Sequence, residues 1–149
     1  MNTVTKFLGD YGTFLDAYLV ALAFTARTER EDELGDAPDA WSNPGGDIRD
    51  IVSADDVRAV LSADDLGAIE SDCAEFLADN RDDIGDDIGG AGSDFLLTRN
   101  RHGAGFWDGD WPMAVGQRLT KAAHAYGAQE LVVLEDPNTG EVTSGWLCH

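Results

Sequence analysis

Apolar residues at helical spacing mark the first part of the chain. Between residues 7 and 22 they recur every three or four positions, which is the spacing of one face of an α-helix. The positions are Phe7, Tyr11, Phe14, Leu15, Tyr18, Leu19 and Leu22. The pattern predicts an N-terminal helix within residues 1–28, whose apolar face packs beneath a sheet. The alternative is an aromatic face that is offered to another subunit or partner.

Residues 29–50 have no sustained period and contain three glycines and two prolines, so we expect a long acidic loop there. Two similar segments follow, Ser-Ala-Asp-Asp-Val at 53–57 and Ser-Ala-Asp-Asp-Leu at 62–66. A serine before a helix accepts a backbone hydrogen bond as its N-cap, and the helix dipole favours acids in the first turn. The repeat therefore predicts two capped helices, over residues 55–61 and 63–80.

The second of these helices is predicted to be amphipathic. Its apolar face carries Leu66, Ile69, Cys73, Phe76 and Leu77, and its outer face carries Asp65, Asp72, Glu75 and Asp79. The sequence Asp-Asp-Ile-Gly then occurs twice, at 82–85 and 86–89. Paired carboxylates are calcium ligands, but the spacing of an EF-hand loop is not met. We expect a solvated acidic turn and no metal.

The last third of the chain shows shorter periods. Residues 94–99 and 103–107 are predicted to form two strands around a turn. A helix is expected to follow from Pro112, capped by Asp110 and closed by Gly127. Residues 131–134 and 141–146 then predict a hairpin around an Asp-Pro-Asn-Thr-Gly turn. The fold class is therefore α+β, with N-terminal helices packed on a small antiparallel sheet in the approximate order αααββαββ.

The composition fits this picture of a single domain in three parts, residues 1–28, 29–94 and 95–149. A chain of 149 residues with 43% hydrophobic content can bury a core, and we expect the four tryptophans to be buried. The two cysteines, Cys73 and Cys148, are predicted to be free thiols in a reducing cytoplasm. The longest apolar run, residues 17–25, is shorter than the ~20 residues that span a bilayer, and no signal-peptide pattern is evident.

The net charge of −19 is concentrated in one part of the chain. Residues 29–94 contain 21 acids against four bases, a net −17. Such a surface repels nucleic acid and anionic membrane, attracts cationic partners and can imitate a phosphate backbone. A second explanation stays open. The chain has 21 Asp against 8 Glu and 8 Arg against 2 Lys, a bias that a halophilic or GC-rich source would give whatever the function.

A dense group of reactive residue types lies at 98–111. It includes a candidate base, His102, two carboxylates, Asp108 and Asp110, and two arginines, Arg99 and Arg101. A hydrolase could use such groups. However, the sequence has no nucleophile elbow, no His-Glu-x-x-His, no Cys-x-x-Cys and no Walker loop. A tight hairpin, with glycines where the backbone is crowded, is the structural interpretation.

The same group carries a resemblance to known proteins. The run Asp-Phe-Leu-Leu-Thr-Arg-Asn-Arg-His-Gly-Ala-Gly-Phe-Trp-Asp at 94–108 and the run Leu-Thr-Lys-Ala-Ala-His-Ala-Tyr-Gly at 119–127 resemble a family of small acidic proteins encoded by tailed phages and prophages. The match covers about a third of the chain, and Leu96 replaces the usual aromatic residue. The resemblance implies a viral origin and a fold, and no mechanism.

The first functional hypothesis is a non-enzymatic viral accessory protein in the cytoplasm of the host cell. Its acidic surface would bind a basic host protein, as a DNA mimic that inhibits a nucleic-acid-binding defence system, without cofactor, membrane or direct nucleic-acid contact. The predicted partner-binding residues are Asp55, Asp56, Asp64, Asp65, Asp72, Glu75, Asp79, Asp82, Asp83, Asp86 and Asp87. The alternative is an enzyme or small-ligand binder centred on Arg99, Arg101, His102, Trp107 and Asp108.

Overall fold

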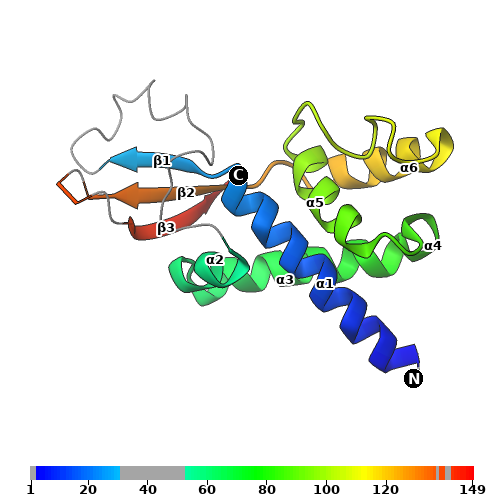
Figure 1. Ribbon diagram of the computed structural model, residues 1–149, viewed down its shortest axis with the longest axis horizontal. Coiled ribbons are helices and arrows are strands. Elements are labelled where there is room, and N and C mark those ends of the chain that lie inside the picture. The colour runs from blue at the N-terminus through cyan, green and yellow to red at the C-terminus, as the bar shows by residue number, and fades with distance from the viewer. Residues whose placement is uncertain (1–2, 31–52, 137, 140–141) are drawn as a thin grey trace.

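The computed structural model describes residues 3–30, 53–136, 138–139 and 142–149 (Figure 1). The elements follow in the order α1 (Thr3–Phe24), β1 (Arg27–Arg30), α2 (Ala54–Val60), α3 (Ala63–Asp79), α4 (Arg81–Ile84), α5 (Ile88–Arg99), α6 (Met113–His124), β2 (Glu130–Glu135) and β3 (Val142–Cys148). The predicted α+β class is confirmed. The predicted order αααββαββ is wrong, because the helices mostly precede the strands and the described residues form three strands.

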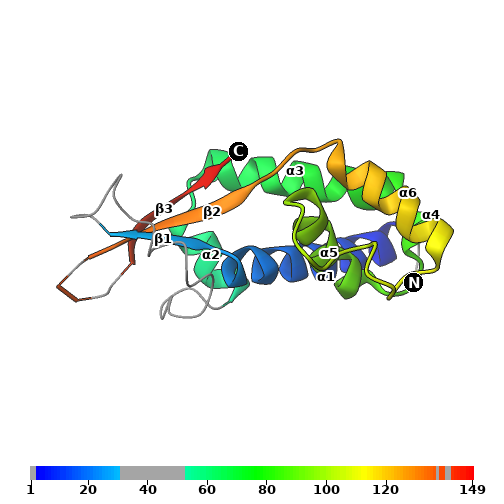
Figure 2. The ribbon, with the colours of Figure 1, turned by 90° about the horizontal axis from the view of Figure 1, so that it is seen from above.

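The helix α1 forms the centre of the molecule. Its buried side chains, Phe14, Tyr18, Leu19 and Leu22 among them, follow the predicted helical spacing. They pack mainly against α5, and also against α2 and α3, so the expectation that this helix lies beneath the sheet is wrong. Figures 1 and 2 show the sheet at one end of the molecule and α4 and α6 at the other, with α1 running between them.

Stacked aromatic rings join the helices around α1. The rings of Phe76 in α3 and Phe95 in α5 stack at 4.1 Å, and Tyr126 meets Phe95 edge-on at 5.1 Å. Phe14 of α1 lies 5.9 Å from Phe95. Offset-stacked and edge-to-face pairs at these separations add to the hydrophobic stabilisation of a core. The cluster thereby fixes the position of α3 relative to the end of α6.

Both strands predicted for residues 94–107 are absent from the structure, which describes all of these residues. Residues 94–99 belong to α5, and residues 103–107 form turns and bends. Asp87 caps α5 by accepting a hydrogen bond from the Gly90 N–H. Ala91, Phe95 and Arg99 then recur every four residues on its buried side. The short apolar run alone fits a buried strand or a buried helix equally well. The helix begins upstream of this run, at Ile88, and its buried side already includes Ala91.

The two helices predicted at the paired Ser-Ala-Asp-Asp segments are confirmed. Ser53 and Ser62 cap α2 and α3 by accepting hydrogen bonds from the N–H groups of Asp56 and Asp65. The helix α6 is also present, but Pro112 occupies its N-cap position and no side chain caps it. The capping role predicted for Asp110 is therefore wrong.

The sheet has the order β1-β2-β3 and is mixed, not purely antiparallel. The predicted hairpin is confirmed as the antiparallel pair β2 and β3, in which Val132 pairs with Trp146. The strand β1 pairs with β2 in parallel, with Arg27 opposite Val132. It begins before and ends within the region where we expected a loop from residue 29. The rest of that loop, residues 31–52, lies outside the described residues.

Cys73 and Cys148 are free thiols, as predicted. Burial raises the pKa of the Cys73 thiol, so this cysteine behaves as a small core residue.

The segment Lys6–Phe24 of α1 is long and apolar enough to cross a membrane by length and composition. A core helix passes the same test, and the buried face of α1 gives this helix a place inside the fold.

Candidate functional site

The acidic side of α3 faces solvent and the neighbouring helix α6. Ile69, Cys73 and Phe76 turn inward. Because successive residues of an α-helix are offset by about 100°, Glu75 and Asp79 project away from that buried side. Both are exposed. The predicted separation of α3 into an apolar and an acidic face is therefore confirmed at these positions, whereas Asp65 and Asp72 of the predicted outer face are half-buried.

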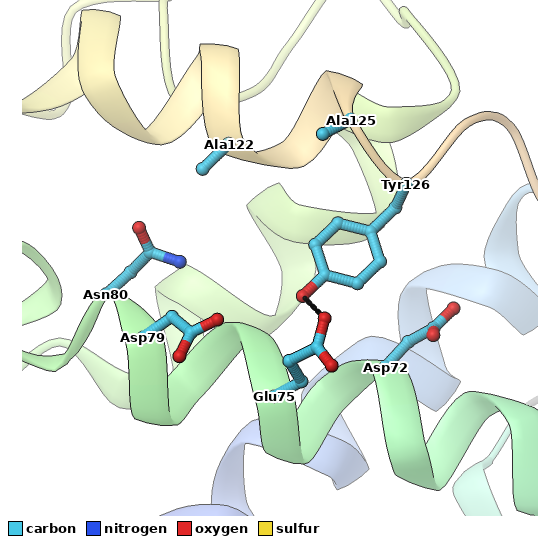
Figure 3. A pocket seen from close by; sticks show the side chains of 7 residues that line it. All are labelled: Asp72, Glu75, Asp79, Asn80, Ala122, Ala125 and Tyr126. Carbon is cyan, nitrogen blue, oxygen red and sulfur yellow. Dashed lines mark hydrogen bonds between the residues drawn. The ribbon is translucent and has the colours of Figure 1, made fainter.

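A groove of about 550 Å³ lies between α3 and the end of α6 (Figure 3). Its lining residues are Asp72, Glu75, Asp79 and Asn80 from the α3 side and Ala122, Ala125 and Tyr126 from the α6 side. The two alanines have short side chains, which leaves the space open. The three carboxylates thus border a hollow that could accept a cationic group of a partner.

Tyr126 holds one of these carboxylates in place. Its Oη donates a 2.9 Å hydrogen bond to Oε1 of Glu75 (Figure 3). Burial and this hydrogen bond raise the pKa of Tyr126, so the phenol stays protonated and remains a donor. Since the Tyr126 ring also packs against Phe95 and Phe76, the position of the Glu75 carboxylate is tied to the core.

Asp72 is paired with a buried arginine at the inner end of the groove. Arg99 is 3% exposed, and its Nη1 lies 3.1 Å from Oδ2 of Asp72. The same guanidinium donates to Tyr18 Oη at 3.0 Å and to the backbone carbonyls of Gly127 at 2.8 Å and Tyr126 at 3.2 Å. Arg99 therefore neutralises Asp72 and joins α5 to α3 and to the segment after α6.

Several of the other predicted partner-binding acids serve the fold. Asp56 completes the capping box with Ser53, and Asp87 caps α5. Oδ2 of Asp65 accepts a hydrogen bond from the Leu147 N–H of β3. Asp55 pairs with Arg58. For these four, an intramolecular contact gives a sufficient reason for the residue type.

Asp83 has a further structural role, because it links α4 to α6. It accepts two hydrogen bonds from Arg118 of α6, of 2.9 and 2.7 Å. These bonds lower the pKa of the Asp83 carboxyl, which keeps this carboxylate ionised and paired at neutral pH.

The remaining predicted acids are exposed and have no ion-pair partner among the described residues, namely Asp64, Asp79, Asp82 and Asp86.

The residues of the alternative centre do not converge on one site. Arg99 is in the core, whereas Arg101 is exposed with a positive φ of 59°. His102 borders an apolar hollow beside Val20 and Phe24. The structure therefore does not bring the two arginines and the histidine together as a catalytic group.

Two of the four tryptophans are exposed, although all four were expected to be buried. Trp107 is 56% exposed and Trp146 is 36% exposed, so the expectation is wrong for both. Trp111 is partly buried against the core, and Trp41 lies outside the described residues. The exposed indoles leave apolar surface at two places on the molecule.

The turn that follows α5 explains one glycine of the motif, Gly105, and its aspartate, Asp108. The N–H of Phe106 donates to Thr98 Oγ1, and the N–H of Gly105 donates to Asp108 Oδ2. Gly105 has a φ of 155°, and a Cβ there would lie 2.4 Å from Thr98 Oγ1. The motif thus forms a close-packed turn, in place of the predicted hairpin.

The acidic groove contains residues that sequence reasoning did not select as functional, namely Asn80, Ala122, Ala125 and Tyr126. The small residues around His124 were the available signal, because short side chains leave room for a groove beside a neighbouring helix. No group of three or more His, Cys, Asp or Glu side chains in the described parts of the chain is arranged to hold a metal ion.

Comparison with known proteins assigns this chain to no family. No protein-family model matches the chain, and neither a curated protein nor a solved structure matches it.

Proposed function

We propose that this chain is a non-enzymatic binding protein whose acidic α3 face and groove bind a basic segment of a partner protein. The observation that carries the proposal is the groove between α3 and α6, where Glu75 and Asp79 are exposed beside a hollow of about 550 Å³. Neither carboxylate has a cationic partner among the described residues. A cation that enters the groove is therefore attracted by two carboxylates whose charge no neighbouring base of the described residues neutralises.

The rigidity of the acidic face favours specific binding over diffuse attraction. Glu75 is held by Tyr126, and α3 is anchored by the aromatic core. Glu75 and Asp79 are four residues apart, about 6 Å along the helix axis. This separation lies between one and two steps of the ~3.4 Å rise between phosphates of one DNA strand. The spacing supports a DNA-mimic role, and the resemblance to phage proteins would place the basic partner in a host cell.

The proposal is tested with octa-arginine as a basic probe, by titration calorimetry at about 0.1 M NaCl. The variant Glu75→Gln/Asp79→Asn removes two charges from the groove and keeps the side-chain shapes. Because exposed ion pairs contribute up to about 1 kcal/mol each, we expect affinity to fall roughly 3- to 10-fold. Asp72 is left unchanged, since its substitution would leave the buried Arg99 without its carboxylate.

The matched control is Glu135→Gln/Asp136→Asn, which removes the same charge at the hairpin end of the sheet. This variant should bind octa-arginine nearly as well as the original protein. Equal weakening by both variants would mean that net charge, and not the groove, determines binding. For the DNA-mimic role, the protein should release a labelled short DNA duplex from octa-arginine. A stable complex of all three components would contradict that role.

A further inference from the structure

A second hollow lies on the other flank of α6. Its volume is about 450 Å³, and Phe106, Trp107, Trp111, Met113 and Gln117 line it. Met113 precedes Ala122 of the acidic groove by nine residues, which corresponds to about half a turn around the helix axis. The two hollows are therefore separated by the body of α6.

This hollow is walled by aromatic rings and has an exposed apolar rim. Phe106 is a buried lining residue. The ring of Trp111 meets that of Phe106 at 5.5 Å and 69°, so the two rings form adjoining walls. Trp107 and Met113 are 56% and 80% exposed. Large apolar side chains left in water around a hollow are typical of a binding surface.

Three carboxylates adjoin the residues that line the hollow, although none of them is itself a lining residue. Trp111 Nε1 donates a 2.7 Å hydrogen bond to Asp94 Oδ2. Asp108 and Asp110 lie in the same turn region, and both act on Asp94: burial raises the pKa of Asp94, and these two carboxylates raise it further. None of the three acids has a cationic partner among the described residues. This local excess of carboxylates beside the aromatic walls favours a cation over an anion or a neutral apolar group.

We propose that this hollow binds an arginine side chain of the basic partner. A guanidinium stacks on tryptophan faces through cation–π attraction, and here the nearby carboxylates can pair with its N–H groups. The hydrogen bond from Trp111 to a carboxylate also increases the electron density of the indole ring. This inference rests on the proposed function, because it names a second anchor for the same partner.

The test uses N-acetyl-argininamide and its uncharged isostere N-acetyl-citrullinamide as probes. The indole N–H signals are followed by ¹⁵N-resolved NMR. We expect saturable shifts of the Trp107 and Trp111 signals with the arginine probe, and at least about tenfold weaker binding of the citrulline probe. Trp107→Leu should lower the affinity for the arginine probe about tenfold. Trp146→Leu, at a partly exposed tryptophan of β3, is the control and should leave it unchanged.

Equal binding of the two probes, or shifts confined to other indoles, would overturn the inference. Octa-arginine separates it from the proposed function. If Glu75→Gln/Asp79→Asn weakens octa-arginine binding while Trp107→Leu has no effect on either probe, the aromatic anchor is wrong and the groove stands. If N-acetyl-argininamide binds at Trp107 while the groove variant binds octa-arginine unchanged, the aromatic anchor stands and the proposed groove is wrong.

Discussion

The buried guanidinium of Arg99 is satisfied by several polar groups of the protein. Its guanidinium donates to Tyr18, Asp72 and two backbone carbonyls, and it lies 5.3 Å from the centre of the Phe95 ring. A buried charge is tolerated when it is paired and its donors are satisfied. Here the compensation comes from three separate parts of the chain, so the residue acts as a joint between them.

We expect Arg99→Ala to destabilise the protein by about 3–5 kcal/mol, because it leaves a cavity in the core and removes the donor to the Tyr18 hydroxyl and to two backbone carbonyls. Urea unfolding measures the change. The control is Arg101→Gln at the neighbouring exposed position, which should change the free energy of unfolding by less than about 0.5 kcal/mol. Similar values for the two variants would contradict a structural role for the Arg99 network.

At the scale of elements, the sequence allows prediction wherever a local signal is sufficient. Ser53 and Ser62 indicate their helices because a cap depends on neighbouring residues. The strand β1 could not be found in this way, since Arg-Thr-Glu-Arg has no apolar alternation and its pairing partner β2 lies far along the chain. Only one wall of the groove, the α3 side, could be predicted from the sequence. The acids of α3 followed from periodicity, but the approach of Tyr126 depends on tertiary packing.

The packing of α1 on α5 depends on a missing side chain at Gly92. A Cβ there would lie 2.2 Å from the Phe14 carbonyl oxygen and 3.1 Å from the Ala17 Cβ. Gly92→Ala should therefore destabilise the protein by roughly 1–3 kcal/mol through overpacking, although alanine has the higher helix propensity. In α3, Gly67 has open space around its Cβ position, and Gly67→Ala should stabilise by roughly 0.5–1 kcal/mol. Thermal or urea unfolding of both variants checks the opposite signs, and a stabilising Gly92→Ala would contradict the close contact.

For the whole molecule, the most important property is that the acids far outnumber the bases that could form ion pairs with them. The net charge is −19, and the described ion pairs already engage Lys6, Arg27, Arg58, Arg81, Arg99 and Arg118. Of the bases whose side chains the structure describes, Arg101 and Lys121 remain outside these pairs. The resulting repulsion opposes the compact state, while the same field attracts a basic partner. A protein that keeps this field must therefore derive its stability from the aromatic and aliphatic core.

This balance predicts that added NaCl stabilises the fold. The Debye length falls from about 30 Å at 0.01 M to about 10 Å at 0.1 M and about 3 Å at 1 M, so repulsion between distant carboxylates is screened first. Salt also weakens the surface ion pairs, but these contribute at most about 1 kcal/mol each. We expect the thermal midpoint to rise by roughly 5 °C between about 0.01 and 0.5 M NaCl, about 1–2 kcal/mol for a chain of this size.

The shape of the salt dependence distinguishes the two explanations of the acidity. Screening is largely complete once the Debye length is shorter than the spacing between neighbouring charges, so simple repulsion predicts a midpoint that levels off near about 1 M. The variant Glu75→Gln/Asp79→Asn should then show a smaller rise, because it carries two fewer acids on α3. A midpoint that falls with salt would contradict the repulsion. A midpoint that keeps rising well beyond that plateau would instead favour a salt-adapted composition, because it requires stabilisation beyond the screening of a local acidic surface.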